Sequence, residues 1–531
     1  MQKLLLLGDE AIAQGALDAG LSGIYAYPGT PSTEIMEYVQ RSKQSKGNNV
    51  FCNWSANEKT AMEAALGMSY AGKRAMVCMK HVGLNVAADP FINSAITGAN
   101  GGLIIVAADD PSMHSSQNEQ DSRFYGKFAL IPVLEPANQQ EAYDMVHYGF
   151  DISEKYKIPV MLRITTRLAH SRSGVERKEP RNQNKITLPE NLRQFVLLPS
   201  IARKQYKDLI NNQKNFLLES ENSGYNKYIK GKDNSLGIIA CGIANNYLLE
   251  NFTDSEIPYP LLKISQYPVP EKLVKKLYDE FEEILVLEEG YPLLEEMLKG
   301  LLNLGKKIKG RLDGTLPRDG ELNPVLVAKA LGMEIKETKK IPDIVAPRPP
   351  SLCAGCPHID SVVVLNDVLK EFSESRVFSD IGCYTLAALP PYESINSCVD
   401  MGASITMAKG AADAGLFPAV AVIGDSTFTH SGITGLLDAV NDNSPITVFI
   451  LDNDTTAMTG GQKSSGSGKL EDICRGIGVR EEHIRVINPL KSHREENFRI
   501  IKEELEYKGV SVIIPRRECI QIIGKKSKEK K

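Results

Sequence analysis

Two short polar segments follow apolar runs in the last third of the chain, and their residue types suit a metal-bound diphosphate. Gly424-Asp425-Ser426 follows AVAVI, and Asn453 follows ITVFIL. Parallel strands of a βαβ unit end at one edge of a sheet, so we expect Asp425 and Asn453 to lie together. Carboxylate and amide oxygens are ligands that Mg²⁺ prefers, with phosphate oxygens completing its octahedron. Gly424 permits close approach of the backbone, and the helix start beyond it favours an anion. The alternative to a metal-binding site is that these residues end two unrelated strands of an α/β fold.

A second group of reactive residues consists of cysteines. Cys353 and Cys356 form a CxxC pair, Cys383 follows in SDIGCYTL, and Cys519 lies near the C-terminus. A thiolate pair at this spacing can hold one metal ion or two corners of an iron–sulfur cluster, and two more thiolates would complete a four-thiolate site. Structural zinc and a redox pair are the alternatives. Spacing alone leaves the fourth ligand open between Cys519, Cys398 and Cys474.

The elements that must position these residues are predicted from apolar patterning. Runs such as LLLLG, GIYAYP, AMVCMK, GLIIVAADD and PVMLRITT alternate with helical patterns in the first block, which predicts a doubly wound parallel sheet. The predicted segments are a first α/β domain (1–171), a connecting segment with a helix (172–234), a smaller α/β domain (235–341), a Pro-rich linker (342–351), a third α/β domain (352–520) and a basic, disordered tail (521–531).

Composition restricts the class of protein. The 531 residues are 42% hydrophobic and 24% charged, typical of a globular protein, and the net charge of −4 does not favour nucleic-acid binding. No apolar run reaches the length of a membrane helix, and the N-terminus lacks a signal peptide pattern, so we expect a cytoplasmic protein without membrane contact. Nine cysteines indicate thiols or metal ligands rather than disulfides. Cys52, Cys78 and Cys241 lie in or beside apolar stretches and are predicted to be buried small hydrophobes.

Many segments, taken in order, resemble one known family. They are YPGTPS, NEK, KHVGLNVAADP, ADDPSMHSSQNEQDSR, CAGCPH, DIGCYTL, GDSTFTHSG and LDNDTTAMTGGQ. Together they look like the large subunits of indolepyruvate ferredoxin oxidoreductases, within the thiamine diphosphate-dependent 2-oxoacid:ferredoxin oxidoreductases. The resemblance spans most of residues 3–520 and is weakest over 172–234. The tripeptide departs from the usual GDG of thiamine enzymes, because Ser426 stands at its third position.

The resemblance implies a fold, a set of cofactors and their ligands. It implies an α/β protein in which two doubly wound parallel-sheet domains, pyrimidine-binding and diphosphate-binding, flank a smaller transketolase C-like domain. The implied cofactors are thiamine diphosphate, Mg²⁺ and one [4Fe–4S] cluster, with coenzyme A as co-substrate. The implied Mg²⁺ ligands are Asp425, Asn453 and the Thr455 carbonyl; Gly424, Ser426 and Met458 complete the diphosphate site; and the implied cluster ligands are Cys353, Cys356, Cys383 and Cys519.

Four residues of the first domain carry the remaining implied roles. Glu58 matches the family's glutamate, which shares a proton with the pyrimidine ring; alone, a glutamate opening a helix usually has a dipole or capping role. Thr30 and Arg123 are candidates to bind a substrate carboxylate, Arg123 through its planar fork. His81, and less so His114, are candidates to exchange protons near neutral pH.

The implied reaction is oxidative decarboxylation of an aryl 2-oxoacid to an arylacetyl-CoA, with electrons passing through the cluster to ferredoxin. A separate small subunit is the implied partner, in a homodimer of heterodimers. The family's large subunit commonly ends in a ferredoxin-like domain with CxxCxxCxxxCP runs, which this sequence lacks, so we expect no further clusters in it.

Two alternatives stay open. A non-redox thiamine-dependent decarboxylase would use Glu58, Asp425 and Asn453 but would need no cysteine set. A cofactor-free or zinc-stabilised assembly subunit would need neither the diphosphate motif nor Glu58. The sequence itself does not identify an aryl-binding pocket or the electron acceptor.

Overall fold

The computed structural model describes residues 3–303, 305–335, 341–346 and 350–529. Two compact units, residues 1–339 and 340–531, divide the chain, and each is described by itself. Within the described residues, every helix is too short or too polar to cross a bilayer.

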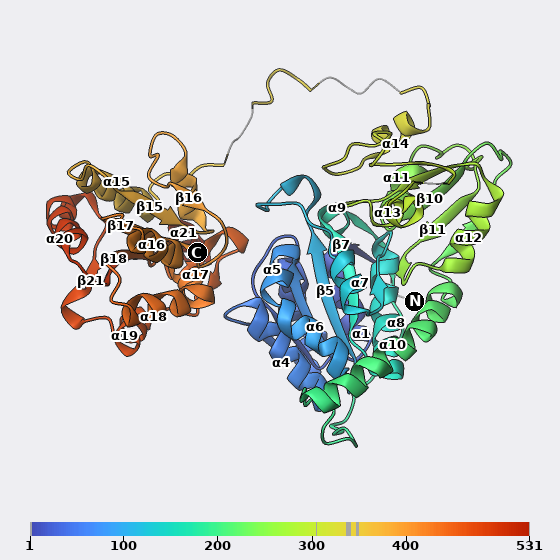
Figure 1. The fold of residues 1–531 in the computed structure, drawn as a ribbon, viewed down its shortest axis with the longest axis horizontal. Helices are drawn as coiled ribbons and strands as arrows, with labels where there is room; N and C mark the ends of the chain where they lie inside the picture. Colours follow the sequence, from blue (N-terminus) through green and yellow to red (C-terminus); the bar gives the residue numbers. More distant parts are fainter. Residues whose placement is uncertain (1–2, 304, 336–340, 347–349, 530–531) are drawn as a thin grey trace. The chain divides into compact units, whose positions relative to one another are not determined.

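A seven-stranded sheet of the first unit has the order β12-β6-β7-β5-β4-β2-β3. Its strands β5 and β7 are labelled in Figure 1. All neighbours are parallel except the pair β12–β6, whose outer strand comes from much later in the chain. The strands are β2 (Gly23–Ala26), β3 (Phe51–Trp54), β4 (Ala75–Lys80), β5 (Leu103–Asp109), β6 (Val133–Leu134), β7 (Val160–Thr165) and β12 (Gln266–Tyr267). The predicted parallel sheet is therefore present, with β3, β6 and β12 in addition to the expected strands.

Helices cover both faces of this sheet because its strands are apolar on both sides. In β4, Met76 and Cys78 belong to one buried cluster with helices α1 and α8, whereas Val77 and Met79 belong to another with α4 and α6. The helices of this layer pair are α1 (Gly8–Asp18), α2 (Thr33–Arg41), α3 (Lys43–Gly47), α4 (Glu58–Tyr70), α5 (His81–Val86), α6 (Ala88–Thr97), α7 (Arg123–Ala129), α8 (Gln139–Tyr156) and α9 (Thr166–His170).

The first apolar run does not join the parallel sheet, so that prediction was wrong. β1 (Lys3–Leu7) instead pairs antiparallel with β8 (Arg172–Glu176) as a separate two-stranded sheet. Exposure explains the difference, because Leu5 is exposed whereas central strands such as β5 are buried throughout. β8 begins the segment predicted as a connection, which continues into the long helix α10 (Pro199–Asn222).

A five-stranded sheet, in the order β14-β13-β10-β11-β9, occupies the second half of the first unit. Its members are parallel except β9, which pairs antiparallel with β11. The elements are β9 (Lys227–Ile229), β10 (Gly237–Cys241), β11 (Leu261–Ile264), β13 (Glu283–Leu287), β14 (Lys307–Lys309), α11 (Ala244–Leu249), α12 (Glu271–Glu280), α13 (Leu293–Lys299) and α14 (Pro324–Ala330). Both large buried clusters of the first unit contain residues of both sheets, so the two predicted domains share their cores.

The second unit is built on a six-stranded, all-parallel sheet in the order β16-β15-β17-β18-β22-β21. Its strands are β15 (Arg376–Ser379), β16 (Ser397–Cys398), β17 (Ala419–Gly424), β18 (Ile446–Leu451), β21 (Ile484–Ile487) and β22 (Ser511–Pro515). Its helices are α15 (Pro357–Leu369), α16 (Ala403–Asp413), α17 (Asp425–Thr427), α18 (Ile433–Asn441), α19 (Leu470–Ile477), α20 (Arg494–Glu506) and α21 (Ile520–Glu529), and a short hairpin joins β19 (Thr455–Thr456) to β20 (Gln462–Lys463).

Helix α21 corrects the prediction that the basic tail is disordered. The helix covers most of residues 521–531, and only 530–531 lie outside the described residues. The Pro-rich linker falls at the boundary between the two units, although 347–349 are also outside the described residues.

Candidate active site

Asp425 follows β17 directly and is one of the buried carboxylates of the second unit. Its side chain is 2% exposed. Oδ1 accepts the backbone N–H of Ser426 at 2.8 Å, whereas no hydrogen-bond partner of Oδ2 is found among the described residues. Burial, together with the negative charge of Asp452, raises the pKa of Asp425 to about 7. A buried carboxylate oxygen without a donor is costly unless a cation faces it, so this side chain fits a metal ligand.

Asn453 follows the adjacent parallel strand, β18, as predicted from the βαβ pattern. Its Oδ1 accepts the backbone N–H of Thr455 at 3.2 Å, and its Nδ2 lies 3.1 Å from Nε2 of His358. Burial lowers the pKa of His358 to about 4, so its imidazole is neutral and accepts the amide N–H. His358 therefore positions Asn453 with its nitrogen occupied and its oxygen available to a cation.

The glycine of the GDS tripeptide has a packing reason that sequence alone did not reveal. A Cβ atom at Gly424 would lie 2.8 Å from the ring of Tyr384, so any larger residue would displace that buried side chain. Ser426 turns its hydroxyl toward Thr456, at 2.9 Å between the oxygens. Met458, assigned to the cofactor by resemblance, lies in a short turn with 62% of its side chain exposed.

The cysteine set comes together in the second unit. Burial, together with the neighbouring thiols of Cys356, Cys519 and Cys353, raises the pKa of Cys383 to about 12. The pKa of Cys356 is raised by burial and by the neighbouring thiols of Cys353 and Cys519. Four neighbouring thiols fit a site in which a positively charged centre holds them as thiolates.

The two other candidates for the fourth ligand are not among the thiols that most strongly raise the pKa of Cys383. Cys398 donates to the backbone oxygen of Asp380, at 3.6 Å, and its pKa is raised by burial and by the Asp380 carboxylate. Cys474 is fully buried in the core formed by α19 and the strands. The geometry therefore favours Cys519 over both.

The thiol set and the diphosphate residues are joined through one residue, Asn453. The backbone N–H of Cys519 donates to the Asn453 carbonyl at 3.2 Å. His358, two residues after Cys356, contacts the side-chain amide of Asn453. Residues from both ends of the second unit thus fix Asn453, so the predicted metal loop and the predicted cluster loops are immediate neighbours.

A buried carboxylate near Cys383 was missed at the sequence level. Asp380 follows β15 directly and accepts hydrogen bonds from the Tyr384 hydroxyl and, at 2.6 Å, from Ser404. Burial raises its pKa to about 7. The only signal in the sequence was its place in the SDIGC segment, directly after an apolar strand.

In the first unit, Glu58 is the first residue of α4 and its side chain is 4% exposed. The helix is capped by Asn57, whose side chain accepts the N–H of Thr60 at 2.8 Å. Capping is therefore not the role of Glu58. A Cβ atom at Gly83 would lie 2.5 Å from Glu58 Oε1, so the glycine of KHVGLN makes room for this carboxylate.

Three predicted loops meet at the carboxyl edge of the first sheet. Ser115 Oγ donates to the Thr30 carbonyl at 3.3 Å, Lys80 Nζ donates to the Ser115 carbonyl at 2.9 Å, and the Ser115 N–H donates to Asp110 at 2.8 Å. His81 opens α5 beside them and is 1% exposed. Its Nε2 lies 3.2 Å from the Asn118 carbonyl, while Nδ1 has no hydrogen-bond partner in the described part of the chain.

Arg123 does not have the position expected of a substrate-binding residue. It is 1% exposed and its guanidinium donates to Asp121 at 2.6 Å, to Glu288 at 2.8 Å and to the Tyr291 carbonyl at 2.7 Å. Asp121 lies in the loop between β5 and α7, whereas Glu288 and Tyr291 follow β13 of the other sheet. The prediction that it binds a carboxylate of the substrate is corrected, because protein acceptors occupy its fork. His114 is half exposed and lies 3.5 Å from Glu321.

Two family models match separate parts of the chain. The model of the pyruvate flavodoxin/ferredoxin oxidoreductase thiamine diphosphate-binding domain matches residues 14–203. The model of the C-terminal TPP-binding domain of thiamine pyrophosphate enzymes matches residues 380–514. The first match contains Glu58 and His81, and the second contains Cys383, Asp425 and Asn453.

Relatives match over nearly the whole chain. The indolepyruvate oxidoreductase subunit IorA of Archaeoglobus fulgidus is 39% identical over 98% of this chain and 86% of its own length. The corresponding subunit of Methanothermobacter thermautotrophicus is 37% identical over 98% of this chain and 88% of its own length. The chain belongs to the IorA family. These findings confirm the predicted family and the predicted thiamine diphosphate-binding α/β fold.

A solved structure similar to this IorA-family chain shows the same fold. It is the 2-oxoglutarate:ferredoxin oxidoreductase of Magnetococcus marinus, with 2-oxoglutarate, coenzyme A and succinyl-CoA bound. The TM-score is 0.51 at 17% identity, covering 62% of this chain and 65% of that one.

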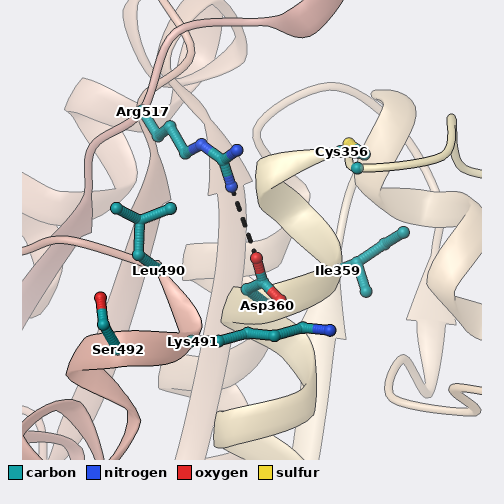
Figure 2. Close-up of a pocket in the computed structure, with 8 residues that line it drawn as sticks. Cys356, Ile359, Asp360, Leu490, Lys491, Ser492 and Arg517 are labelled. Carbon is teal, nitrogen blue, oxygen red and sulfur yellow. Dashed lines mark hydrogen bonds and ion pairs between the residues drawn. The ribbon is translucent and has the colours of Figure 1, made fainter.

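Beside the CxxC pair, the IorA-family chain has an open pocket of about 540 Å³ (Figure 2). Cys356 and Asp360 contribute from one side, and Lys491 and Arg517 from the other. Arg517 is paired with Asp360 at 3.4 Å, and Lys491 is exposed. The pocket gives the thiol site a solvent-facing side that carries positive charge.

We expect Arg123→Met to destabilise this IorA-family protein strongly, because it removes the cation paired with the buried Glu288 and leaves the buried Asp121 with Arg163 alone. The free energy of unfolding should fall by about 3–5 kcal/mol. The matched control is Arg167→Met, whose partner Glu321 is near the surface and whose own side chain is 46% exposed; it should cost about 1 kcal/mol or less. Chemical denaturation followed by circular dichroism measures both. Equal effects of the two substitutions would contradict the structural role of Arg123.

Proposed function

We propose that the chain is the catalytic subunit of a thiamine diphosphate-dependent aryl 2-oxoacid:ferredoxin oxidoreductase. An aryl pyruvate, coenzyme A and two oxidised ferredoxins would give an arylacetyl-CoA, carbon dioxide, two reduced ferredoxins and a proton. The observation that carries the proposal is the fixing of Asn453 by His358 and by the Cys519 backbone, because it makes a diphosphate–metal loop adjacent to a four-thiol set. The names of the IorA relatives support the indolepyruvate-like substrate.

The residues of the second unit are proposed to hold Mg²⁺, the cofactor's diphosphate and the cluster. Asp425 Oδ2, Asn453 Oδ1 and the Thr455 carbonyl would bind Mg²⁺ through oxygen, which fits the unpartnered Asp425 oxygen. Cys353, Cys356, Cys383 and Cys519 would hold a [4Fe–4S] cluster. When bound, thiamine diphosphate supplies a nucleophilic carbon and an electron sink for decarboxylation, and the cluster takes up electrons singly.

The residues of the first unit are proposed to manage protons and the substrate. Glu58 would hold a proton shared with the cofactor's pyrimidine ring, in the space that Gly83 leaves for its carboxylate. His81 would exchange a proton through Nδ1, because Nε2 faces the Asn118 carbonyl. The Thr30 hydroxyl would donate to the substrate carboxylate. Arg123 has no part in this proposal.

The proposed partners are a small subunit and ferredoxin. The word "subunit" in the relatives' names supports a separate partner chain, and we propose a homodimer of heterodimers. The coenzyme A of the similar oxidoreductase structure supports coenzyme A as the acyl acceptor here.

The test is anaerobic purification with any co-purifying small subunit, followed by assay with indolepyruvate, coenzyme A and ferredoxin. Iron, acid-labile sulfide and thiamine are measured per chain. Four iron, four sulfide and one thiamine, with CoA-dependent ferredoxin reduction, are expected. Thiamine without iron, and carbon dioxide released without coenzyme A, would replace the proposal by a non-redox decarboxylase. Zinc without thiamine would indicate an assembly subunit.

We further expect Lys491→Glu to weaken the reaction with ferredoxin selectively. The substitution reverses a positive charge beside Cys356, where an acidic carrier would approach the cluster. The KM for ferredoxin should rise roughly threefold or more at low salt, and the difference should shrink at high salt. Lys508→Glu is the control, because it changes the net charge equally at an exposed loop that does not line the pocket. An unchanged KM for ferredoxin would show that ferredoxin does not bind at this pocket.

A further inference from the structure

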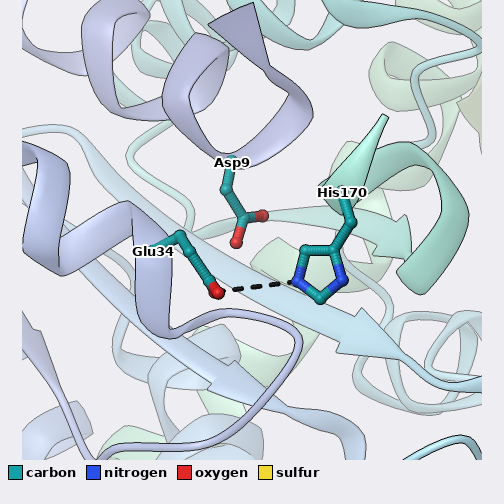
Figure 3. A group of neighbouring side chains, drawn as sticks. All are labelled: Asp9, Glu34 and His170. Atoms are coloured by element: carbon teal, nitrogen blue, oxygen red, sulfur yellow. Dashed lines mark ion pairs between the residues drawn. The ribbon is translucent and has the colours of Figure 1, made fainter. Parts of the chain in front are cut away.

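Three side chains that the proposed reaction does not use meet near one edge of the first sheet. Asp9 comes from α1, Glu34 from α2 and His170 from the end of α9 (Figure 3). One possible ligand atom of each lies within 4.8 Å of the others, and Glu34 Oε2 is 3.7 Å from His170 Nε2. The close packing of α1 on α9 brings them together, since a Cβ atom at Gly8 would lie only 2.2 Å from the Leu168 carbonyl oxygen.

Asp9 is the observation that points to a ligand. Its side chain is fully buried and is directed toward the other two residues (Figure 3). Neither of its carboxylate oxygens has a hydrogen-bond partner among the described residues, and Glu34 Oε2 has none either. Burial raises the pKa of Asp9 well above its usual range, and the Glu34 carboxylate adds to that. A buried carboxylate in this state, beside a second and partly exposed carboxylate, needs a cation or a proton between the two.

We propose that Asp9, Glu34 and His170 form a site for a divalent transition-metal ion of the Zn²⁺ or Mn²⁺ type. Two carboxylates, a neutral imidazole and a divalent cation together carry no net charge. Carboxylate oxygen with imidazole nitrogen suits these ions, at ligand distances of about 2.0–2.2 Å, so the three side chains would close slightly around the ion. Glu34 and His170 are 34% and 36% exposed, which leaves a solvent side for water ligands.

The ion would connect three helices that follow different strands. α2 begins directly after the Tyr27–Ser32 loop, which contains Thr30, and α9 follows β7. Binding of the ion would therefore stabilise the first unit and fix the start of α2 behind that loop. This role is independent of the proposed reaction, because none of the three residues has a part in it.

A proton shared between Asp9 and Glu34 is the competing occupant. The charged or titratable groups facing Asp9 are Glu34, Glu10, His170 and the buried Cys78. In that case Asp9 is protonated in the folded protein, and its contribution to stability is lost as the pH rises through its raised pKa. The two occupants therefore predict different responses to metal ions and to Asp9→Asn.

The experiment compares the full-length wild type with Asp9→Asn and His170→Gln, using Mn²⁺ as the probe because thiolates bind it poorly. Electron paramagnetic resonance measures free Mn²⁺ and so gives the Mn²⁺ bound per chain. Sites that all three proteins share cancel when the bound Mn²⁺ of a variant is subtracted from that of the wild type. We expect the wild type to bind one more Mn²⁺ per chain than Asp9→Asn, and His170→Gln to bind it at least tenfold more weakly. Mn²⁺ should raise the melting temperature of the wild type and not of Asp9→Asn.

The amide of Asp9→Asn keeps the volume of the carboxyl and can donate to Glu34, so folding should be retained; His170→Gln gives an independent test at a partly exposed position. Glu37→Gln, on the same helix as Glu34, is the control and should bind Mn²⁺ as the wild type does. Equal Mn²⁺ binding by the wild type and both site variants would overturn the proposal. An Asp9→Asn protein at least as stable as the wild type, with no response of either to Mn²⁺, would assign the site to a shared proton.

Discussion

Replacing Glu58 by glutamine should lower the turnover of oxoacid oxidation by about 100- to 10,000-fold, the range by which positioned acid–base groups accelerate reactions. Glutamine has nearly the same volume, so it fits the space beside Gly83, but its amide cannot share a proton with the pyrimidine ring. Thiamine bound per chain should stay unchanged, because the diphosphate residues lie in the second unit. Steady-state ferredoxin reduction and thiamine analysis measure the two effects.

The control for this prediction lies on the same helix. Glu63 is 46% exposed and forms an ion pair with Lys59, so Glu63→Gln removes the same charge without changing the proposed site. It should retain the turnover of the wild type. A Glu58→Gln protein with full turnover, or one that has lost its thiamine, would remove Glu58 from the proposed proton-sharing role.

Replacing Cys383 by serine should abolish ferredoxin reduction while leaving thiamine bound. The other three thiols are all near enough to raise the pKa of Cys383, so its loss removes one of four neighbouring ligands. Serine is a poor ligand for iron–sulfur clusters, so we expect the iron and acid-labile sulfide content to fall. We expect the rate of ferredoxin reduction to fall with it, by more than about 100-fold. Anaerobic metal analysis and the ferredoxin assay report the two changes separately.

Cys398→Ser is the matched control for the cluster prediction. Its thiol donates to the Asp380 carbonyl and is not among the groups that perturb Cys383. Iron content should match the wild type. Loss of iron in Cys398→Ser with retention in Cys519→Ser would reverse the choice of the fourth ligand that the geometry favours.

The local sequence pattern was sufficient to predict a strand where that strand is buried on both faces. AVAVIG and ITVFIL form β17 and β18 over the predicted residues, and their parallel pairing places Asp425 and Asn453 at one edge. The same pattern failed for LLLLG, because an apolar run does not reveal its partner. β1 pairs with β8, and the exposed side of Leu5 became visible only in the structure.

Residues whose roles depend on distant partners could not be assigned from the sequence. Arg123 was interpreted as a substrate-binding fork, but its acceptor Glu288 is far away along the chain. His358 stands two residues after Cys356, yet its contact with the Asn453 amide requires the folded edge of the sheet. The identity of the fourth thiol ligand stayed undecided for the same reason. The number of residues between two loops does not tell how close the loops lie in the fold.

The pairing of β12 with β6 has a consequence for the order in which the protein is made. β6 ends its sheet until Gln266 and Tyr267 have left the ribosome and paired with Val133 and Leu134. Until then the nascent chain also holds Arg123 without Glu288, whose carboxylate is synthesised later still. The edge of the first sheet at β6 therefore stays open until Gln266 and Tyr267 are made. During that interval the open edge needs protection from other chains.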